Sequence, residues 1–177
     1  SIGVVGGYTS LALDNSGKVH ISYFDDYPNY DLKYATNASG AWVTRTVDRK
    51  KKVGWYTSLA LDNSGKAHIS YYGNGDLKYT TNGSGVWVTQ TVDRKGRVGF
   101  YTSLALDNSG KAHISYLNYT NGDLRYATNA SGAWVKRTVD RKGRVGFYTS
   151  LALDNSGKAH ISYFDWDNKY LMYARKR

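Results

Sequence analysis

One string of letters, YTSLALDNSGK, occurs four times in this chain of 177 residues, beginning at Tyr8, Tyr56, Tyr101 and Tyr148. Self-similarity at a spacing of about 47 residues is typical of repeat architectures, in which each copy folds as one small structural unit. The chain is therefore expected to form a single domain over residues 1–177, made of four repeats at approximately 8–55, 56–100, 101–147 and 148–177.

Each repeat reads as four short β-strands. In the first copy the strands are expected at TSLALD (9–14), VHISYF (19–24), DLKYAT (31–36) and WVTRTVD (42–48). These segments are rich in Val, Thr, Tyr and Trp, which favour strands. The DNSGK and NASG segments between them carry the Asn and Gly residues that tight turns require. No segment shows a helical period over a useful length, so the sequence predicts an all-β fold.

Four antiparallel strands in a unit of this length are typical of a β-propeller blade. A parallel β-helix would need shorter coils, and a β-sandwich would not explain near-identical units. The segment SLALDNSGKAHISY, followed by DLKYAT, resembles the repeats of NHL-type and related propellers, which also place an Asp-x-x-Gly turn between their first two strands. The resemblance extends over nearly the whole chain and implies the fold. It also admits RNA binding, because some NHL-type propellers bind RNA on a basic face.

The last repeat has no segment of the WVTRTVD kind, so its blade is expected to lack its own outer strand. An unpaired sheet edge invites pairing with another strand. Ser1–Val5 could supply that strand and close a four-bladed ring, the ring could stay open in a monomer, or another copy could complete it. We favour self-association as a homo-oligomer, with an eight-bladed ring of two chains as one possible form.

Alternating strand direction places the loop after each second strand at the same end of the blades as the segments that link consecutive repeats. We call this end the top face, and the end that carries the DNSGK and NASG turns the bottom face. The bottom turns hardly vary among the copies, whereas the top loops FDDYPNY, YGNG, LNYTNG and FDWDNKY differ in length. Loops that vary on a constant framework are where function is expected.

The linking segments bring basic side chains to the top face, namely Arg49, Lys50, Lys51, Lys52, Arg94, Lys95, Arg97, Arg141, Lys142 and Arg144. With a formal net charge of +10, this rim is predicted to attract polyanions such as acidic glycans or nucleic acid. Each linking segment also carries one aromatic residue that could stack on a sugar or a base, namely Trp55, Phe100 and Phe147. The alternative is a solvated loop copied with its blade, with the aromatic residues packing between blades.

The variable top loops add acidic and aromatic side chains that break the repeat and suit recognition of sugar hydroxyls. These candidate ligand-binding residues are Asp25, Asp26, Tyr27, Tyr30, Tyr119, Asp165, Trp166 and Asp167. Irregular loop structure without a ligand is the alternative. Four Asn-x-Ser/Thr sequons, at Asn37, Asn82, Asn118 and Asn129, are possible glycosylation sites, although turn chemistry already explains three of them.

One His recurs at the same position of every second strand, as His20, His68, His113 and His160. Second strands do not line the axis of a propeller, so these side chains cannot converge on a metal ion. Each sits in a separate gap between blades and is expected to bond a neighbouring Ser, Thr or Asp inside that gap. The turn aspartates Asp14, Asp62, Asp107 and Asp154 are expected to accept hydrogen bonds from the backbone two residues on. Neither a metal nor a cofactor is predicted.

The chain has no Cys, and all 14 of its acidic residues are Asp. Most of these fall in repeated turn positions, which counts against acid–base catalysis. We therefore predict a non-enzymatic, multivalent binding protein, lectin-like or adhesive, that favours carbohydrate or acidic glycans on the top face. The alternatives are an engineered or recently amplified repeat scaffold that self-assembles, and single-stranded nucleic acid binding. Composition suggests secretion, and no apolar run approaches the roughly 20 residues of a membrane span.

Overall fold

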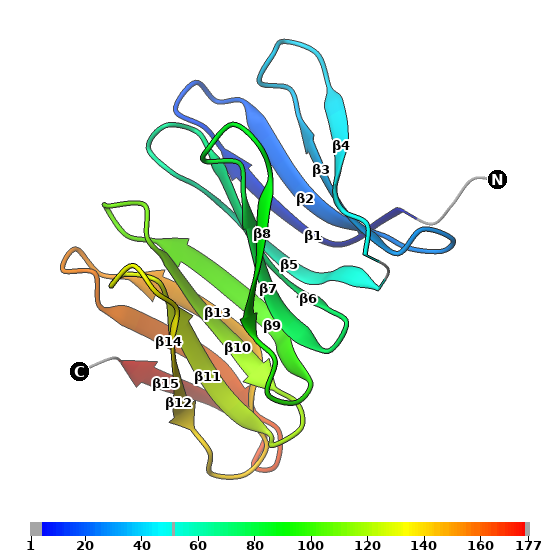
Figure 1. Ribbon diagram of the computed structural model, residues 1–177. Coiled ribbons are helices and arrows are strands. Elements are labelled where there is room, and N and C mark those ends of the chain that lie inside the picture. The colour runs from blue at the N-terminus through cyan, green and yellow to red at the C-terminus, as the bar shows by residue number, and fades with distance from the viewer. Residues whose placement is uncertain (1–4, 51, 176–177) are drawn as a thin grey trace.

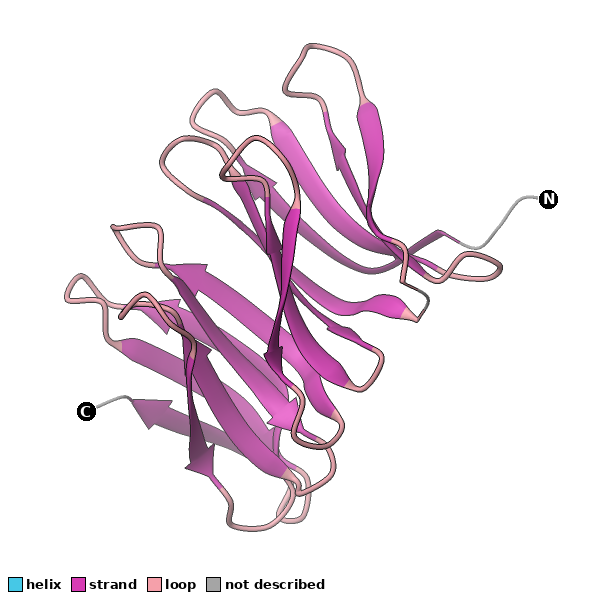
Figure 2. Cartoon of the chain, in the orientation of Figure 1, coloured by secondary structure: helices cyan, strands magenta, loops and turns pink. Residues whose placement is uncertain are grey.

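The computed structural model describes residues 5–50 and 52–175, and these residues form strands, turns and loops without a helix (Figure 2). Four antiparallel sheets follow one another along the chain and are called blades 1 to 4 (Figure 1). Blade 1 contains β1 (Val5–Leu13), β2 (Val19–Asp25), β3 (Asp31–Thr36) and β4 (Val43–Asp48). Blade 2 contains β5 (Val53–Leu61), β6 (Ala67–Gly73), β7 (Asp76–Thr81) and β8 (Val88–Asp93). Blade 3 contains β9 (Val98–Leu106), β10 (Ala112–Asn118), β11 (Asp123–Thr128) and β12 (Val135–Asp140). Blade 4 contains β13 (Val145–Leu153), β14 (Ala159–Asp165) and β15 (Tyr170–Arg175).

The predicted blade organisation is confirmed. Within each sheet, strands that are consecutive in sequence pair with each other, so every blade is an antiparallel meander. Among the described residues, blade 4 has three strands, as the missing WVTRTVD segment indicated. The described residues include no helix that could span a membrane.

The first strand of each blade begins earlier than the sequence suggested. β1 starts at Val5 rather than at Thr9, because Val5 pairs with Asp25 and Gly7 pairs with Phe24 across the β1–β2 ladder. Two register shifts interrupt this pairing, and Tyr8 lies beside them with a φ of 50°. The end of each linking segment is therefore part of the sheet, which holds its aromatic residue at a fixed position.

Consecutive blades stack side by side in an open arc, with blade 1 and blade 4 at its opposite ends (Figure 1). β1, β5, β9 and β13 lie next to one another along the inner side of the arc. Closure by Ser1–Val5 was one expectation for this chain. Val5 pairs inside blade 1, and residues 1–4 lie outside the described residues.

The hydrophobic core lies between blades rather than within them. Leu32 and Tyr34 of blade 1 pack against Val53 and Leu59 of blade 2. The same residue types meet at the other two contacts between consecutive blades, which we call junctions. At the first junction Gly54 has a φ of +103°, and a Cβ there would lie 3.0 Å from the Cα of Leu32. Glycine therefore sets how closely two blades approach.

Each junction also carries buried hydrogen bonds. The Tyr71 hydroxyl of blade 2 donates to Oδ2 of Asp48 at the end of blade 1, at 2.7 Å. Tyr116 and Tyr163 bond Asp93 and Asp140 in the same way at the next two junctions. Burial is the main cause that raises the pKa of Tyr71, and the Asp48 carboxylate adds to it. The hydroxyl therefore stays protonated and able to donate.

The repeated histidines are structural. Nε2 of His68 lies 3.4 Å from Oδ2 of Asp62, one of the residue types expected as a partner, and this Asp comes from the same blade. Nδ1 faces the Tyr79 hydroxyl, a partner the sequence did not predict. A neutral ring with its proton on Nε2 satisfies both bonds. Asp62 also accepts hydrogen bonds from the amides of Ser64 and Lys66, which confirms the expected turn chemistry.

We predict that Tyr71→Phe lowers the free energy of unfolding by about 1–3 kcal/mol, because it leaves a buried Asp48 oxygen without its donor. Urea denaturation of the wild type and the variant would measure this. Tyr27→Phe is the control, because Tyr27 is exposed in a top loop. Equal stability of the wild type and Tyr71→Phe would show that the bond contributes nothing to the junction.

We predict that stability falls as the pH drops below about 6.5, the pKa of an unfolded His. Burial lowers the pKa of His68 in the folded state, so acid favours the unfolded chain, which takes up the proton more readily. The stabilisation is complete above pH 6.5 and is lost as the pH falls through the folded pKa. Denaturation at pH 7.5 and at pH 5 should show a smaller pH dependence for His68→Gln than for the wild type. An unchanged dependence would contradict this assignment.

Candidate functional site

The top face is assembled from the linking segments and the variable loops. At blade 2 the amide of Asn74 donates to the carbonyl of Lys52, and at blade 3 the amide of Tyr119 donates to that of Arg97. The amide of Trp166 donates to the Arg144 carbonyl in blade 4. Each basic segment is therefore bonded to the variable loop of the blade that it enters.

The basic segments are held by the same aspartates that anchor the junctions. Oδ1 of Asp48 accepts a hydrogen bond from the amide of Lys50 at 3.1 Å, and Asp93 and Asp140 make the equivalent bond. This turn leaves a set of basic side chains exposed, namely Arg49, Lys50, Lys52, Arg94, Lys95, Arg97, Arg141, Lys142 and Arg144. Lys51 lies outside the described residues. These exposed basic side chains are thus carried on turns that hydrogen bonds to the aspartates hold in place.

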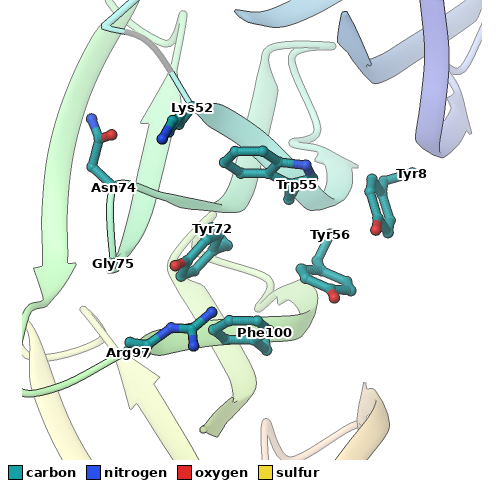
Figure 3. A pocket seen from close by; sticks show the side chains of 9 residues that line it. All are labelled: Tyr8, Lys52, Trp55, Tyr56, Tyr72, Asn74, Gly75, Arg97 and Phe100. Atoms are coloured by element: carbon teal, nitrogen blue, oxygen red, sulfur yellow. The ribbon is translucent and has the colours of Figure 1, made fainter. Parts of the chain in front are cut away.

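A pocket of about 380 Å³ opens on the top face at the junction of blades 2 and 3 (Figure 3). Its aromatic wall includes Trp55 and Tyr72 of blade 2 and Phe100 of blade 3. The ring centroids of Tyr72 and Phe100 are 4.4 Å apart, and those of Trp55 and Tyr72 are 5.8 Å apart. The remaining lining comprises Tyr8, Lys52, Tyr56, Asn74, Gly75 and Arg97.

A second pocket, of about 490 Å³, lies at the junction of blades 3 and 4. Arg144 and Phe147 occupy the repeat positions of Arg97 and Phe100, so the two pockets are built on the same plan. Trp166 lies beside Phe147, with tilted rings whose centroids are 5.1 Å apart, and extends the aromatic wall. The variable loops make the pockets differ, because Leu117 replaces Tyr72 and Tyr119 replaces Asn74.

The two pocket arginines have different neighbours. The Arg97 guanidinium lies 5.0 Å from the ring centroid of Tyr119 and 5.4 Å from that of Phe100. Arg144 instead pairs with Asp167, with its Nε 2.7 Å from Oδ1 of that carboxylate. The backbone and side-chain bonds from Arg144 lower the pKa of Asp167. A carboxylate already holds the Arg144 charge, whereas the Arg97 charge faces aromatic rings.

Most of the acidic candidates in the top loops hold the loops themselves. Asp25 is buried, lies 3.2 Å from Nζ of Lys33 and accepts a hydrogen bond from the Asn29 amide group. Asp165 is also buried and accepts bonds from the next loop residues, including Asn168. Asp25 therefore bonds nearby side chains, and Asp165 also holds loop backbone, so neither carboxylate faces solvent.

The first variable loop presents its rings differently. Oδ1 of Asp26 accepts the amide hydrogen of Tyr27 at 2.8 Å, which fixes the start of the loop. The Tyr27 ring is exposed, and its centroid lies 6.2 Å from that of Tyr30. Tyr30 occupies the repeat position of Gly75, a pocket residue in blade 2. A large tyrosine side chain at the first junction therefore takes the place of the glycine that lines the pocket at the second junction.

Sequence reasoning missed the tyrosine that follows each linking aromatic residue. Tyr8, Tyr56, Tyr101 and Tyr148 form a row in which neighbouring ring centroids are 4.6 to 4.7 Å apart. With the threonines that follow them they line a shallow groove of about 260 Å³. Tyr56 also lines the pocket between blades 2 and 3, and burial raises its pKa. The signal was present, because this Tyr is identical in all four copies.

Comparison with known proteins shows the fold. No protein-family model matches the chain, and no curated protein matches its sequence. Among solved structures, AofleA from Arthrobotrys oligospora is similar with a TM-score of 0.70 and 14% identity, over 98% of this chain and 54% of that one. The Penicillium chrysogenum alpha-L-arabinanase complexed with arabinobiose has a TM-score of 0.69 and 12% identity, over 99% of this chain and 66% of that one.

The chain folds as a β-propeller. It spans about half the length of AofleA. A fucose lectin from Kordia zhangzhouensis, in complex with methyl-fucoside, is similar with a TM-score of 0.50 and 19% identity, over 73% of this chain and 96% of that one. The structures that share this propeller fold thus include a lectin and an enzyme. The narrower resemblance to NHL-type repeats finds no matching family model.

Proposed function

We propose that this propeller is a non-enzymatic, lectin-like protein that binds carbohydrate in the pockets between its blades, with a preference for acidic glycans. The observation that carries the proposal is the repetition of one pocket plan at two junctions, each with an aromatic wall and an arginine. Pockets of about 300–1,000 Å³ with a few polar groups are typical of small-ligand sites.

The chemistry of the pocket between blades 2 and 3 suits an acidic sugar. Trp55, Tyr72 and Phe100 offer ring faces to the apolar C–H surface of a pyranose. Lys52 and Arg97 stand beside them, and a guanidinium can bind a carboxylate or sulfate with two parallel hydrogen bonds. Asn74 adds an amide that can donate to and accept from sugar hydroxyls.

A binding role is favoured over hydrolysis by the absence of paired carboxylates. Most glycoside hydrolases need two carboxyl groups that flank the scissile bond. Neither set of described residues that lines the two pockets contains an Asp, and the sequence has no Glu. Asp167, beside the second pocket, is paired with Arg144. The described lining of either pocket therefore lacks the two carboxyl groups that would act as general acid and nucleophile.

The two pockets lie on the same face, so one glycan chain can bind both and the overall affinity rises. A glycan with repeated units can occupy both, and the second contact then forms at a high effective concentration. Modest single-site affinity is sufficient for firm attachment to a surface. The same face carries the basic rim, which attracts polyanionic chains over a longer range. We propose that such a protein acts outside the cell, where glycan-coated surfaces are exposed.

We predict that a glycan array of neutral, uronic-acid and sulfated oligosaccharides gives its strongest signals with acidic members. In calorimetric titration with the best of these, Trp55→Ala should weaken one class of site by about 5- to 150-fold, because aromatic stacking contributes about 1–3 kcal/mol. Trp55→Ala combined with Trp166→Ala should remove both classes. Arg97→Gln should reduce affinity for acidic sugars more than for neutral ones.

Trp42→Ala is the matched control, because Trp42 is an exposed tryptophan beside the bottom turn of blade 1. It should bind like the wild type. An inactive array at low salt, or equal weakening by Trp42→Ala and Trp55→Ala, would contradict the proposal. Binding to single-stranded oligonucleotides with a steep salt dependence, and without sugar binding, would support nucleic acid as the ligand instead.

A further inference from the structure

Each of the three internal junctions packs one face of a blade against the opposite face of the next blade. Blades 1 and 4, at the two ends of the arc, each leave one of these two faces exposed. On blade 1, Val5 and Leu11 are 63% and 60% exposed, whereas their repeat equivalents Val53 and Leu59 are 0% and 7% exposed. Leu13, in the same strand, is 59% exposed. Blade 1 therefore leaves open the face that blades 2, 3 and 4 each bury.

Blade 4 leaves open the opposite face. Leu171 and Tyr173 are 82% and 61% exposed, whereas Leu32 and Tyr34 at the same repeat positions of blade 1 are 0% and 5% exposed. Exposed apolar patches of this kind mark interaction surfaces in folded proteins. Here the complementary surface is known, because the internal junctions show what the Leu32 type of face packs against.

The polar half of the junction is preserved as well. At the first internal junction Oγ1 of Thr57 donates to Oγ of Ser22 at 2.7 Å, and the amide of Leu59 donates to Oγ of Ser10 at 3.0 Å. Blade 1 offers Thr9 and the Leu11 amide at the positions of Thr57 and Leu59, and blade 4 offers Ser162 and Ser150 at those of Ser22 and Ser10. Gly6, with a φ of +91°, stands where Gly54 allows close approach.

We propose that blade 4 of one copy docks on blade 1 of a second copy, head to tail, in the register of the internal junctions. Two copies that make this contact at both ends form a closed ring. The proposal goes beyond glycan binding, which needs only one chain. The occupant is a second copy because both halves of a three-times-repeated interface stand exposed on the same chain, at opposite ends of the arc (Figure 1).

One internal contact has no counterpart in this docking. In each internal junction a tyrosine hydroxyl bonds an aspartate at the end of the fourth strand, as Tyr71 bonds Asp48. Among the described residues, blade 4 has no fourth strand to supply that aspartate. The contact between copies is therefore expected to be weaker than an internal junction and to depend on protein concentration.

Light scattering during size-exclusion chromatography tests the association. The chain of 19.8 kDa should run as an oligomer whose mass falls on dilution. Leu171→Asp and Leu11→Asp should each give a folded monomer, because both side chains are already exposed in the single chain. Val86→Asp is the control, since Val86 is 66% exposed but lies in a bottom turn away from the junctions. A monomer at every concentration, or an oligomer that both Leu variants retain, would overturn the proposal.

Engineered disulfides test the register, since the chain has no Cys of its own. The double variant Thr9→Cys with Ser162→Cys should form cross-links between chains on oxidation, seen as a mass of two or more chains on a non-reducing gel. Neither single variant should do so. Ser22→Cys with Thr57→Cys should cross-link within one chain and serves as the positive control. A disulfide between positions 9 and 162 inside one chain would show a self-closed four-bladed ring and overturn the proposal.

Discussion

The fold and the candidate site both depend on the packing of one blade against the next. Leu32, Tyr34, Val53 and Leu59 form an apolar contact that excludes water, and Gly54 lets the backbones approach closely. Single blades cannot bury these faces alone, so stability in such arrays comes largely from nearest-neighbour contacts. Because the same contact is made three times, the inter-blade spacing is constant and the tyrosine rings stay in register along the inner strands.

The pockets follow from the same contact. Trp55 and Tyr72 come from blade 2, Phe100 comes from blade 3, and Arg97 comes from the segment that links the two, so neither blade contains the site alone. Asp48 and its repeat equivalents connect the junction to the top face. One carboxylate oxygen accepts a hydrogen bond from the buried tyrosine hydroxyl at the junction, and the other accepts one from the backbone of the basic loop. Repeated framework and variable loops together give sites that share a plan and differ in detail.

Much of the fold could be predicted from the sequence because identical strings mark the same point in every repeat. Four identical strings fixed the number of blades, and alternating apolar residues fixed the strands. Trp55, Phe100 and Phe147 were recognised as candidates because they recur beside basic residues, and all three line or border the top-face pockets. An Asp was among the residue types expected to bond each His, and the one that does so lies in the same hairpin, six residues away in sequence.

Other parts of the site depend on contacts between blades and could not be predicted. Tyr72 and Asn74 become pocket residues only when blade 3 packs beside them. The Arg144–Asp167 ion pair joins residues from a linking segment and an irregular loop, whose distance no periodicity specifies. Asp25 and Asp165 looked like exposed ligands by composition, yet their loops turn them inward, where they bond nearby loop residues.

Hydrogen–deuterium exchange with and without a bound acidic oligosaccharide tests most directly whether the junctions create the binding sites. The account predicts slower exchange in residues 52–56, 72–75 and 97–101 around the first pocket, and in 117–122 and 144–148 around the second. The bottom turns, such as 14–18 and 62–66, should exchange at the same rate in both samples. Protection confined to the bottom turns or to the outer strands, or no protection at all, would contradict the account.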